Sequence, residues 1–321
     1  MSTTDHHAEP SHSGDCPPCA EAPVLERIDA HRAVIGEGFV LRRALPTAAR
    51  RMVGPWCFLD HLGPAEYAAG NGLAVGPHPH IGLQTFTWLV EGEIFHRDSL
   101  GTEQIIRPGQ VNLMTAGRGI AHSEDTVTPD AGRVHAAQLW IALPDAERHR
   151  APSFHHYATL PQVEDGGFVA TVLAGESMGL RAPAEVFSPI VGVDYCALGA
   201  AQRSAPLEPT FEHAVLVMSG EVTVEGETVA PGTLLYLGRG RRSVALRTAE
   251  AARLLLVGGA PFGEEVLMWW NFVGRTHEEI LAAAEDWNAG RAFAPVVGSP
   301  SPRIPAPDVG GLRLRASRGR R

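Results

Sequence analysis

An internal repeat of short strands and tight turns constrains the fold of this chain more than any other feature of its sequence. Each copy has an apolar strand, a Gly-Glu turn, a second strand, a Pro-Gly turn and a further apolar strand. The copies are residues 86–114 and 215–237, with Gly-Glu at Gly92-Glu93 and Gly220-Glu221, and Pro-Gly at Pro108-Gly109 and Pro231-Gly232. We interpret each Gly-Glu pair as a β-hairpin turn. The repeat predicts two related β-domains that divide between residues 145 and 185.

The rest of the chain also has the pattern of an all-β protein. Gly and Pro recur at intervals of about 8–12 residues between short β-branched or aromatic runs, as in β-sandwiches and barrels. The clearest helix runs from Thr276 to about Asn288, where Thr276 and Glu279 form a capping box. Its expected buried face is Ile280, Leu281, Ala284 and Trp287. The expected fold is two tandem β-domains with a short C-terminal helix.

Composition shifts suggest where the domains begin and end. Residues 1–22 are rich in His, Pro, Ser and acidic side chains, and residues 297–321 are rich in Pro and Gly and end in a basic run. We expect both ends to be disordered tails. The remaining chain divides into a first domain over 23–150, a connecting segment over 151–185 and a second domain over 186–296.

Charge and hydrophobicity exclude several functional classes. The chain is 44% hydrophobic and 20% charged, with no apolar run long enough to cross a membrane and no secretory signal pattern. The net charge of −9 argues against a nucleic-acid partner. Four cysteines in 321 residues do not form a disulfide framework and suit a reducing compartment. We therefore expect a soluble cytoplasmic protein, monomeric, without a membrane partner.

Four side chains in the first domain have the spacing of a metal site. Residues two apart on a β-strand point to the same face, so His78 and His80 form one pair, and His122 and Glu124 form another. Either pair alone is as consistent with a chance arrangement on the protein surface as with a metal site. Together, on facing strands of a small barrel, they present three imidazoles and a carboxylate, which suit Fe, Cu, Ni, Mn or Zn.

The second copy of the repeat serves as an internal control. The positions that correspond to the two pairs fall near Pro206 and Glu208 and near Ala245 and Arg247. No ligand set is preserved there. We expect chemistry in the first domain only, because packing requirements alone would not place four such residues in one copy and none in the other.

Several segments closely resemble the pirins, bicupin proteins of the cupin superfamily. The matching segments are FLDHLG from Phe58, PHPHIGLQTFTWLVEGEIFHRDSLG from Pro77, MTAGRGIAHSE from Met114, Gln138-Leu139-Trp140 with Leu143-Pro144, APFGEEV from Ala260 and RTHEEILAAAEDWNAGRAF from Arg275. The resemblance covers roughly residues 25–295, and PHPH and GRGIAHSE are its most specific blocks.

The resemblance implies two jelly-roll cupin domains and one iron ion. Its ligands would be His78, His80, His122 and Glu124; Mn, Ni, Cu, Zn and Co are alternative metals. Some pirins cleave the flavonol quercetin as 2,3-dioxygenases, and others are transcriptional co-regulators or bind metabolic enzymes. Two functions therefore stay open: a dioxygenase acting on a small enolic aromatic with dioxygen, and an iron-dependent redox sensor that binds a protein partner.

Some positions depart from the family pattern and affect the expected pocket. The general cupin glutamate ligand is replaced by Gln84, and the arginine that follows the second histidine in many pirins is replaced by Ile81. The stretch Trp269–Gly274 is also altered. These changes concern pocket shape and substrate rather than the metal. For the dioxygenase, we assign the role of general base to Glu124.

Other residues have both a functional and an ordinary interpretation. Phe58, Phe86, Trp88 and Met114 are candidates to line an apolar mouth, although each is more simply barrel core. His61 and His96 are candidates to support the ligands or the fold, and Arg118 is either a pocket or a surface residue. The Cys16-Pro-Pro-Cys19 segment, near His6, His7 and His12, is more simply a tail without a specific metal than a binding site.

Overall fold

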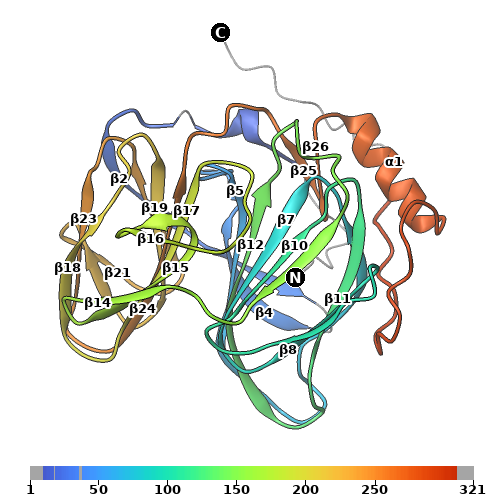
Figure 1. Ribbon diagram of the computed structural model, residues 1–321, viewed down its shortest axis with the longest axis horizontal. Helices are drawn as coiled ribbons and strands as arrows, with labels where there is room; N and C mark the ends of the chain where they lie inside the picture. The colour runs from blue at the N-terminus through green and yellow to red at the C-terminus, as the bar shows by residue number, and fades with distance from the viewer. Residues whose placement is uncertain (1–9, 18, 36–37, 309–321) are drawn as a thin grey trace.

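The computed structural model describes residues 10–17, 19–35 and 38–308 of the chain. Figure 1 shows two β-domains side by side, with helix α1 (His277–Asn288) at the outer edge of the first domain. Each domain is a larger sheet that faces a smaller one, with seven and four strands in the first and eight and four in the second. The mostly β architecture with a C-terminal helix confirms the expected fold class.

The first domain has two antiparallel sheets. The larger sheet contains β13 (Ser153–Tyr157), β10 (Val111–Thr115), β7 (Leu83–Glu91), β12 (Gly132–Ala142), β5 (Trp56–Tyr67), β4 (Phe39–Leu45) and β3 (His31–Ile35), in that order. The smaller sheet contains β6 (Ala74–His80), β11 (Ile120–Thr126), β8 (Ile94–Asp98) and β9 (Glu103–Ile106).

The second domain repeats this plan. Its larger sheet contains β14 (Gln162–Asp165), β15 (Phe168–Ser177), β17 (Ile190–Ala197), β24 (Ala252–Gly259), β19 (Glu212–Ser219), β22 (Thr233–Gly238) and β2 (Pro23–Asp29), with β16 (Leu180–Arg181) paired to β15. Its smaller sheet contains β18 (Ala201–Pro206), β23 (Ser243–Thr248), β20 (Val222–Val224) and β21 (Glu227–Val229).

The Gly-Glu turns of the repeat are not hairpin turns, so this expectation was wrong. Gly92-Glu93 joins β7 to β8, and Gly220-Glu221 joins β19 to β20, but each pair of strands belongs to two different sheets. Both glycines have positive φ angles, and a Cβ on either would meet a carbonyl oxygen of a neighbouring strand end. The turns therefore carry the chain from one sheet to the other at a close backbone approach, which only glycine permits.

The two larger sheets pack against each other through a shared apolar cluster. Phe86 and Trp88 from the first domain meet Leu216 and Leu255 from the second in this cluster. The Trp88 indole N–H also donates to Asp194 Oδ1 at 3.2 Å. These two aromatic side chains thus face the second domain and do not line the mouth of the first barrel.

Both ends of the described chain pack against the fold where composition suggested disorder. In β1 (Ser11–His12), Ser11 pairs with Met268 of β25 (Leu267–Trp269), which pairs in turn with β26 (Phe272–Gly274). Near the other end, the Ile304 N–H donates to the Pro77 carbonyl, so this segment lies along the smaller sheet of the first domain. Short-range composition misses such contacts because the partners are distant in sequence. Residues 1–9 and 309–321 lie outside the described residues.

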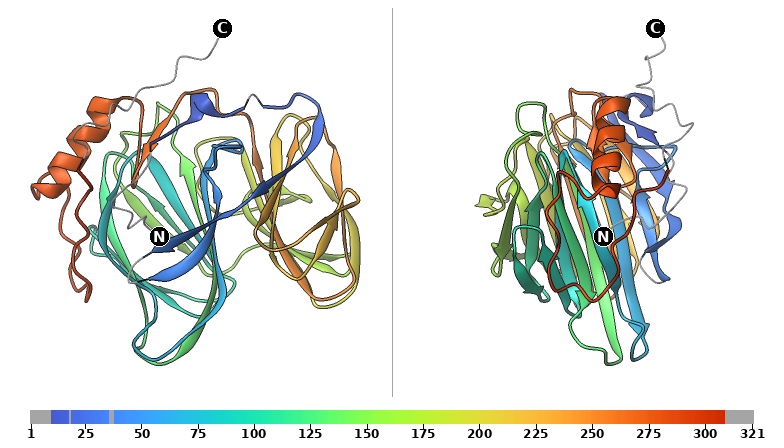
Figure 2. Two further views of the ribbon diagram at one scale, coloured as in Figure 1. Left: turned by 180° about the vertical axis from the view of Figure 1, so that it is seen from behind. Right: turned by 90° about the vertical axis from the view of Figure 1, so that its right-hand side faces the viewer.

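The domains also exchange segments across the expected boundaries. Strand β2 begins at Pro23 but lies in the larger sheet of the second domain, and Figure 2 shows the blue N-terminal strands running from that domain across to the first. Within the expected connecting segment, β13 pairs with the first domain and β14 to β16 with the second. A boundary drawn only along the sequence cannot describe this exchange.

Helix α1 (His277–Asn288) follows the sequence prediction closely. The Thr276 side chain caps its first turn by accepting from the Glu279 N–H, while the Glu279 carboxylate accepts from the Arg275 N–H. The buried face is Ile280, Ala283, Ala284 and Trp287, so Ala283 takes the place expected for Leu281. Within the described ranges, no helix is long and apolar enough to cross a membrane.

Candidate metal centre

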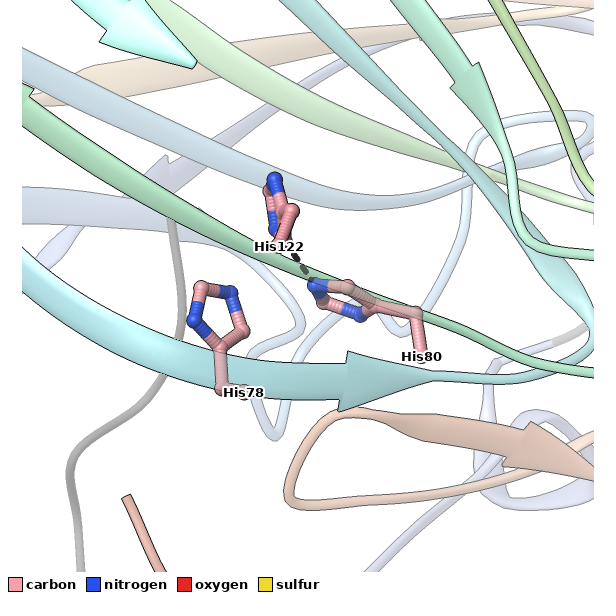
Figure 3. Close-up of side chains that lie close together, drawn as sticks. All are labelled: His78, His80 and His122. Atoms are coloured by element: carbon pink, nitrogen blue, oxygen red, sulfur yellow. Dashed lines mark hydrogen bonds between the residues drawn. The ribbon is translucent and has the colours of Figure 1, made fainter. Parts of the chain in front are cut away.

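Strands β6 and β11 bring three histidines together inside the first barrel. The strands are antiparallel, and His122 lies directly opposite His78. Figure 3 shows His78, His80 and His122 directed toward one another, with 3.0 Å between His80 Nε2 and His122 Nε2. One ring nitrogen from each lies within 4.8 Å of the others, and all three side chains are buried. The convergence expected from the spacing of these histidines is present.

Glu124 belongs to a second group that shares one of these histidines. A register shift in β11 between His122 and Glu124 places Glu124 opposite Val75. Its carboxylate lies within 4.8 Å of ring nitrogens of His96 and His122, and the side chain is 2% exposed. Sequence spacing pointed to Glu124, whereas the contribution of His96 comes from the neighbouring strand β8.

Hydrogen bonds fix which nitrogen of each ring faces the cluster. His78 Nδ1 lies 2.8 Å from the Gly76 carbonyl oxygen, and His80 Nδ1 lies 3.0 Å from the Asn271 carbonyl oxygen. Because a carbonyl oxygen can only accept, both rings donate from Nδ1. Their Nε2 atoms then keep a free lone pair, which is the state that binds a metal.

His122 is oriented by a chain of side chains instead of a carbonyl. The His96 Nε2–H donates to Asp98 Oδ2 at 3.1 Å, which turns Nδ1 of His96 toward His122. His122 Nδ1 lies 3.3 Å from that atom, and when it donates there the Nε2 lone pair of His122 is free for a metal. With that donation, the Asp98–His96–His122 chain gives His122 the same tautomer as the other two rings.

Asp98 is fixed by the turn that follows β8. The backbone N–H groups of Leu100 and Thr102 donate to its Oδ1 at 2.8 and 3.0 Å. Burial raises the pKa of Asp98, but the bonds from His96 and from these two N–H groups outweigh it, and the net pKa lies below the ordinary value. Asp98 is thus an ionised anchor for His96.

Burial keeps the three imidazoles neutral. It lowers the pKa of His78 to about 3, and it lowers the pKa values of His80 and His122 well below the ordinary 6.5. Neutral imidazole is the form that coordinates a metal. No proton has to leave these rings near neutral pH before an ion binds.

The donor set fits a transition-metal ion. His78 Nε2 is buried and has no hydrogen-bond partner in the part of the chain that the structure describes. A buried acceptor without a partner is costly unless a ligand satisfies it. Three oriented imidazoles with a carboxylate beside them match the preference of Fe, Mn, Ni, Cu, Co and Zn.

An aromatic wall on the larger sheet faces the histidines. Trp140 lies 5.2 Å from the His80 ring, between centroids, and stacks on Phe58 at 4.0 Å. Phe154 stacks on His96 at 4.4 Å, and Met114 is its direct neighbour across β10 and β13. Of the four apolar candidates from the sequence, Phe58 and Met114 therefore belong to the histidine side of the sheet.

A polar row lies next to this wall on the same face. Gln138 is two residues before Trp140 on β12, and its Oε1 accepts from the Thr87 hydroxyl at 2.8 Å. Its Nε2 is buried without a partner in the described structure. The sequence gave no reason to single out Gln138 beyond the family resemblance, because its burial depends on the packing of both sheets.

The altered stretch at Trp269–Gly274 lies beside the site. Strands β25 and β26 are joined by Trp270 and Asn271, and the Asn271 carbonyl is the one that orients His80. Trp269 and Trp270 also line a groove of about 530 Å³ that reaches Phe58. Trp270 has φ of 52°, a conformation that is strained for a bulky side chain and that clusters at ligand sites.

The remaining candidates lie elsewhere. Gln84 Nε2 donates to the Thr115 hydroxyl and to the Glu185 carbonyl. The amide group at the general cupin ligand position therefore bonds to these residues and not to the histidines. His61 pairs with His135 at 3.0 Å between Nε2 atoms. Arg118 lines a small cavity of about 190 Å³ near α1.

Comparison with known proteins gives a consistent result. The pirin family model matches residues 38–141, and the model of the pirin C-terminal cupin domain matches residues 193–293. A Pseudomonas aeruginosa protein named "Putative quercetin 2,3-dioxygenase PA1205" is 50% identical, over 96% of this chain and 98% of the relative. A pirin-like protein of Caulobacter vibrioides is 40% identical, over 83% of this chain and 94% of the relative. The crystal structure of a quercetin 2,3-dioxygenase from Acinetobacter baumannii superposes with a TM-score of 0.88 at 44% identity, covering 91% of this chain and 98% of that one.

Proposed function

The chain belongs to the pirin family, and from this premise we propose that it is an Fe(II)-dependent dioxygenase that cleaves quercetin or a related enolic aromatic with dioxygen. The observation that carries the proposal is the pairing of three neutral, oriented imidazoles with an aromatic wall across the barrel. The names of two similar proteins, from Pseudomonas and Acinetobacter, supply the reaction class. Fold alone would not, because one fold hosts many reactions.

The proposed metal ligands are the Nε2 atoms of His78, His80 and His122 and the carboxylate of Glu124. When bound there, Fe(II) would supply open coordination positions and redox chemistry for dioxygen and an enolic oxygen. The backbone carbonyls of Gly76 and Asn271 hold the first two rings, as their hydrogen bonds show. Asp98 holds the third ring through His96.

Glu124 has a further role in the proposal. In the proposed reaction the enolic hydroxyl of the substrate gives up its proton. Glu124 is two residues after His122, and its carboxylate lies within 4.8 Å of a ring nitrogen of that histidine. We assign it to accept that proton as general base.

The wall and the polar row give the substrate its position. Trp140 is the aromatic ring nearest the three histidines for a planar ring system to pack against, and its orientation is fixed by the stack on Phe58, over whose ring Arg43 also lies. The Gln138 Nε2, a buried donor without a partner in the described residues, suits a carbonyl or hydroxyl oxygen of the substrate. Both features fit a small aromatic molecule with several oxygens.

Oxygen uptake by the iron-loaded protein tests the proposal. Purified protein is loaded with Fe(II) without air, mixed with quercetin and dioxygen, and followed with an oxygen electrode beside the His122→Ala variant. We expect uptake that needs iron, quercetin and His122. An iron-loaded protein that consumes no oxygen with quercetin would exclude quercetin as the substrate and favour the alternative from the sequence, an iron-dependent regulator that binds a protein partner.

A further inference from the structure

The groove that reaches Phe58 contains charged side chains that the proposed function leaves unused. Its volume of about 530 Å³ lies within the range of small-molecule pockets, about 300–1,000 Å³. Its aromatic lining is Phe58, Trp269 and Trp270, and its charged lining is Asp29, Arg43 and Arg51. A ligand that fills the groove therefore needs a flat apolar face together with polar substituents.

A row of planar groups in contact connects this groove with the histidine cluster. The Trp140 ring lies 5.2 Å from the His80 ring and stacks on Phe58 at 4.0 Å, between centroids. The Arg43 guanidinium carbon lies 4.4 Å from the centroid of the Phe58 ring. Phe58 and Arg43 also line the groove, so the row runs from the groove to His80. A planar molecule with one end at the histidines can extend along this row towards Arg43.

Two hydrogen bonds hold Arg43 in place. Its Nε and Nη2 atoms donate to Oδ1 and Oδ2 of Asp60, each at 2.8 Å. The Asp60 side chain is fully buried, whereas 13% of the Arg43 side chain is exposed. The fork turns Nη1 away from Asp60, and this nitrogen bonds to no other residue that the structure describes. Arg43 thus offers, on a fixed side chain, a donor for a ligand oxygen.

The remaining polar lining of the groove combines donors with an acceptor. Arg51 can only donate hydrogen bonds, whereas the Asp29 carboxylate can only accept them. Burial and the charge of Arg43 lower the pKa of His31, so this ring is neutral and has one donor and one acceptor. A carboxylate on the ligand would meet the Asp29 carboxylate, and an amine would meet the arginines. Hydroxyl groups, which both donate and accept, match all of these partners.

From these contacts we propose that Arg43 determines specificity and that the groove takes an aromatic ring with two adjacent hydroxyl groups, carried by the substrate of the proposed dioxygenase. The inference rests on the proposed function, because the enolic end of the same molecule lies at the histidines. Arg43 Nη1 donates to one of the hydroxyl oxygens, Asp29 accepts from a hydroxyl group, and Trp270 packs against the ring. Quercetin has such a ring next to its enolic carbon, so it fits both ends of the row.

Apolar packing alone is the competing account of the groove. Phe58, Trp269 and Trp270 would bind any flat aromatic ring, with or without hydroxyl groups. A site built to hydrogen-bond hydroxyl groups rejects an analogue that lacks them, because its own polar groups are then left unpaired. Quercetin and galangin separate the two accounts, since galangin is the same flavonol without the two hydroxyl groups on the outer ring.

Binding to the metal-free protein tests the proposal without turnover, and neither flavonol can then bind iron instead of the protein. Dissociation constants for quercetin and galangin are measured by titration calorimetry under nitrogen. We expect wild type to bind quercetin on the order of 10-fold more tightly. Arg43→Lys keeps a positive charge beside Asp60 but loses the planar fork, and the ratio should fall to about 2-fold or less. Arg42→Lys changes the exposed arginine before it on β4, on the opposite face, and should keep the wild-type ratio.

Oxygen uptake by the iron-loaded protein separates this inference from the proposed function. We expect the kcat/KM ratio of the two flavonols to follow the ratio of their affinities. Equal affinities in wild type, or a preference that persists in Arg43→Lys, would overturn the role of Arg43 even if both flavonols drive uptake. A preference that Arg43→Lys removes, without any uptake, would support the groove site and exclude quercetin as the substrate. The wild-type comparison needs no variant, and circular dichroism establishes that the variants are folded.

Discussion

The two domains share one strand plan but turn different side chains into their barrels. In the first domain, β6 and β11 direct His78, His80 and His122 inward. The strands in the same position of the second domain are β18 and β23, and their buried residues include Ala205, Val244 and Leu246. These inward positions of the second barrel are mainly apolar, with Arg203 of β18 as a buried exception, and within the described residues no group of three or more ligand side chains gathers there.

This contrast separates the scaffold from the site. An apolar core gains stability from burial alone, whereas buried imidazoles lose their contacts with water and need partners. The first domain accepts this cost at the cluster that carries its chemistry. Two domains with similar folds can therefore differ in function, and the residues inside each barrel decide what that domain can do.

Replacing one buried histidine in each barrel should give the largest difference between the two domains. We expect His122→Ala to lower the affinity for Fe(II) by at least about 100-fold, because a ligand is lost. His213→Ala removes a buried histidine from β19 of the second domain and should leave the affinity unchanged. Anaerobic metal titration of both variants measures the effect. Equal losses would show that the two barrels do not differ as described.

Changing the carboxylate should separate metal binding from turnover. We expect Glu124→Gln to reduce turnover about 100-fold, because the amide cannot accept the substrate proton, while most iron is retained. Glu208→Gln is the control, since Glu208 is an exposed carboxylate of the second domain. Oxygen uptake and iron per chain are measured on the same samples. Equal loss of iron and turnover in Glu124→Gln would count against the general-base role.

Changing Asp98, which holds His122 through His96, should have a smaller effect on metal binding. Asp98→Asn can donate a proton to His96, which would reverse the tautomers of His96 and His122 and remove the free Nε2 lone pair. We expect metal affinity to fall about 10-fold to 100-fold. Asp125→Asn is the matched control, because Asp125 bonds to Arg97 and Ser301 instead of to the histidines. An unchanged affinity in Asp98→Asn would exclude the proposed orienting role.

Acid should destabilise the metal-free first domain before the second. The folded-state pKa of His78 is about 3, below the ordinary 6.5, so the unfolded chain binds more protons between these values and stability falls as the pH drops through this window. At pH 5 one such imidazole costs about 2 kcal/mol. The second domain contributes His213, whose pKa burial lowers to about 4. Hydrogen exchange measured at pH 7 and pH 5 should show that amide opening increases more in the first domain than in the second. An equal increase in both domains would contradict this.

Much of the fold and of the site could be predicted because the signals were local. The two-residue spacing of His78 and His80 placed both rings on one face, and Thr276 with Glu279 marked the start of the helix. The sequence could not show whether a Gly-Glu turn stays within a sheet, because the same turn residues serve both connections.

The supporting contacts of the site were beyond the reach of local patterns. The carbonyl that orients His80 belongs to Asn271, which is 191 residues away. Phe86 and Trp88 had the apolar character expected of a pocket wall, but strand alternation and domain packing turn them to the opposite face. Only the assembled sheets decide such contacts.

Anomalous diffraction from crystals of the Fe(II)-loaded protein, measured at the iron edge, tests the central claim most directly. The account predicts one peak in the first barrel, within about 2.3 Å of Nε2 of His78, His80 and His122, with Glu124 beside it and no peak in the second barrel. A peak bound through His96 and Nδ1 of His122, a peak in the second barrel, or no peak at all would contradict it.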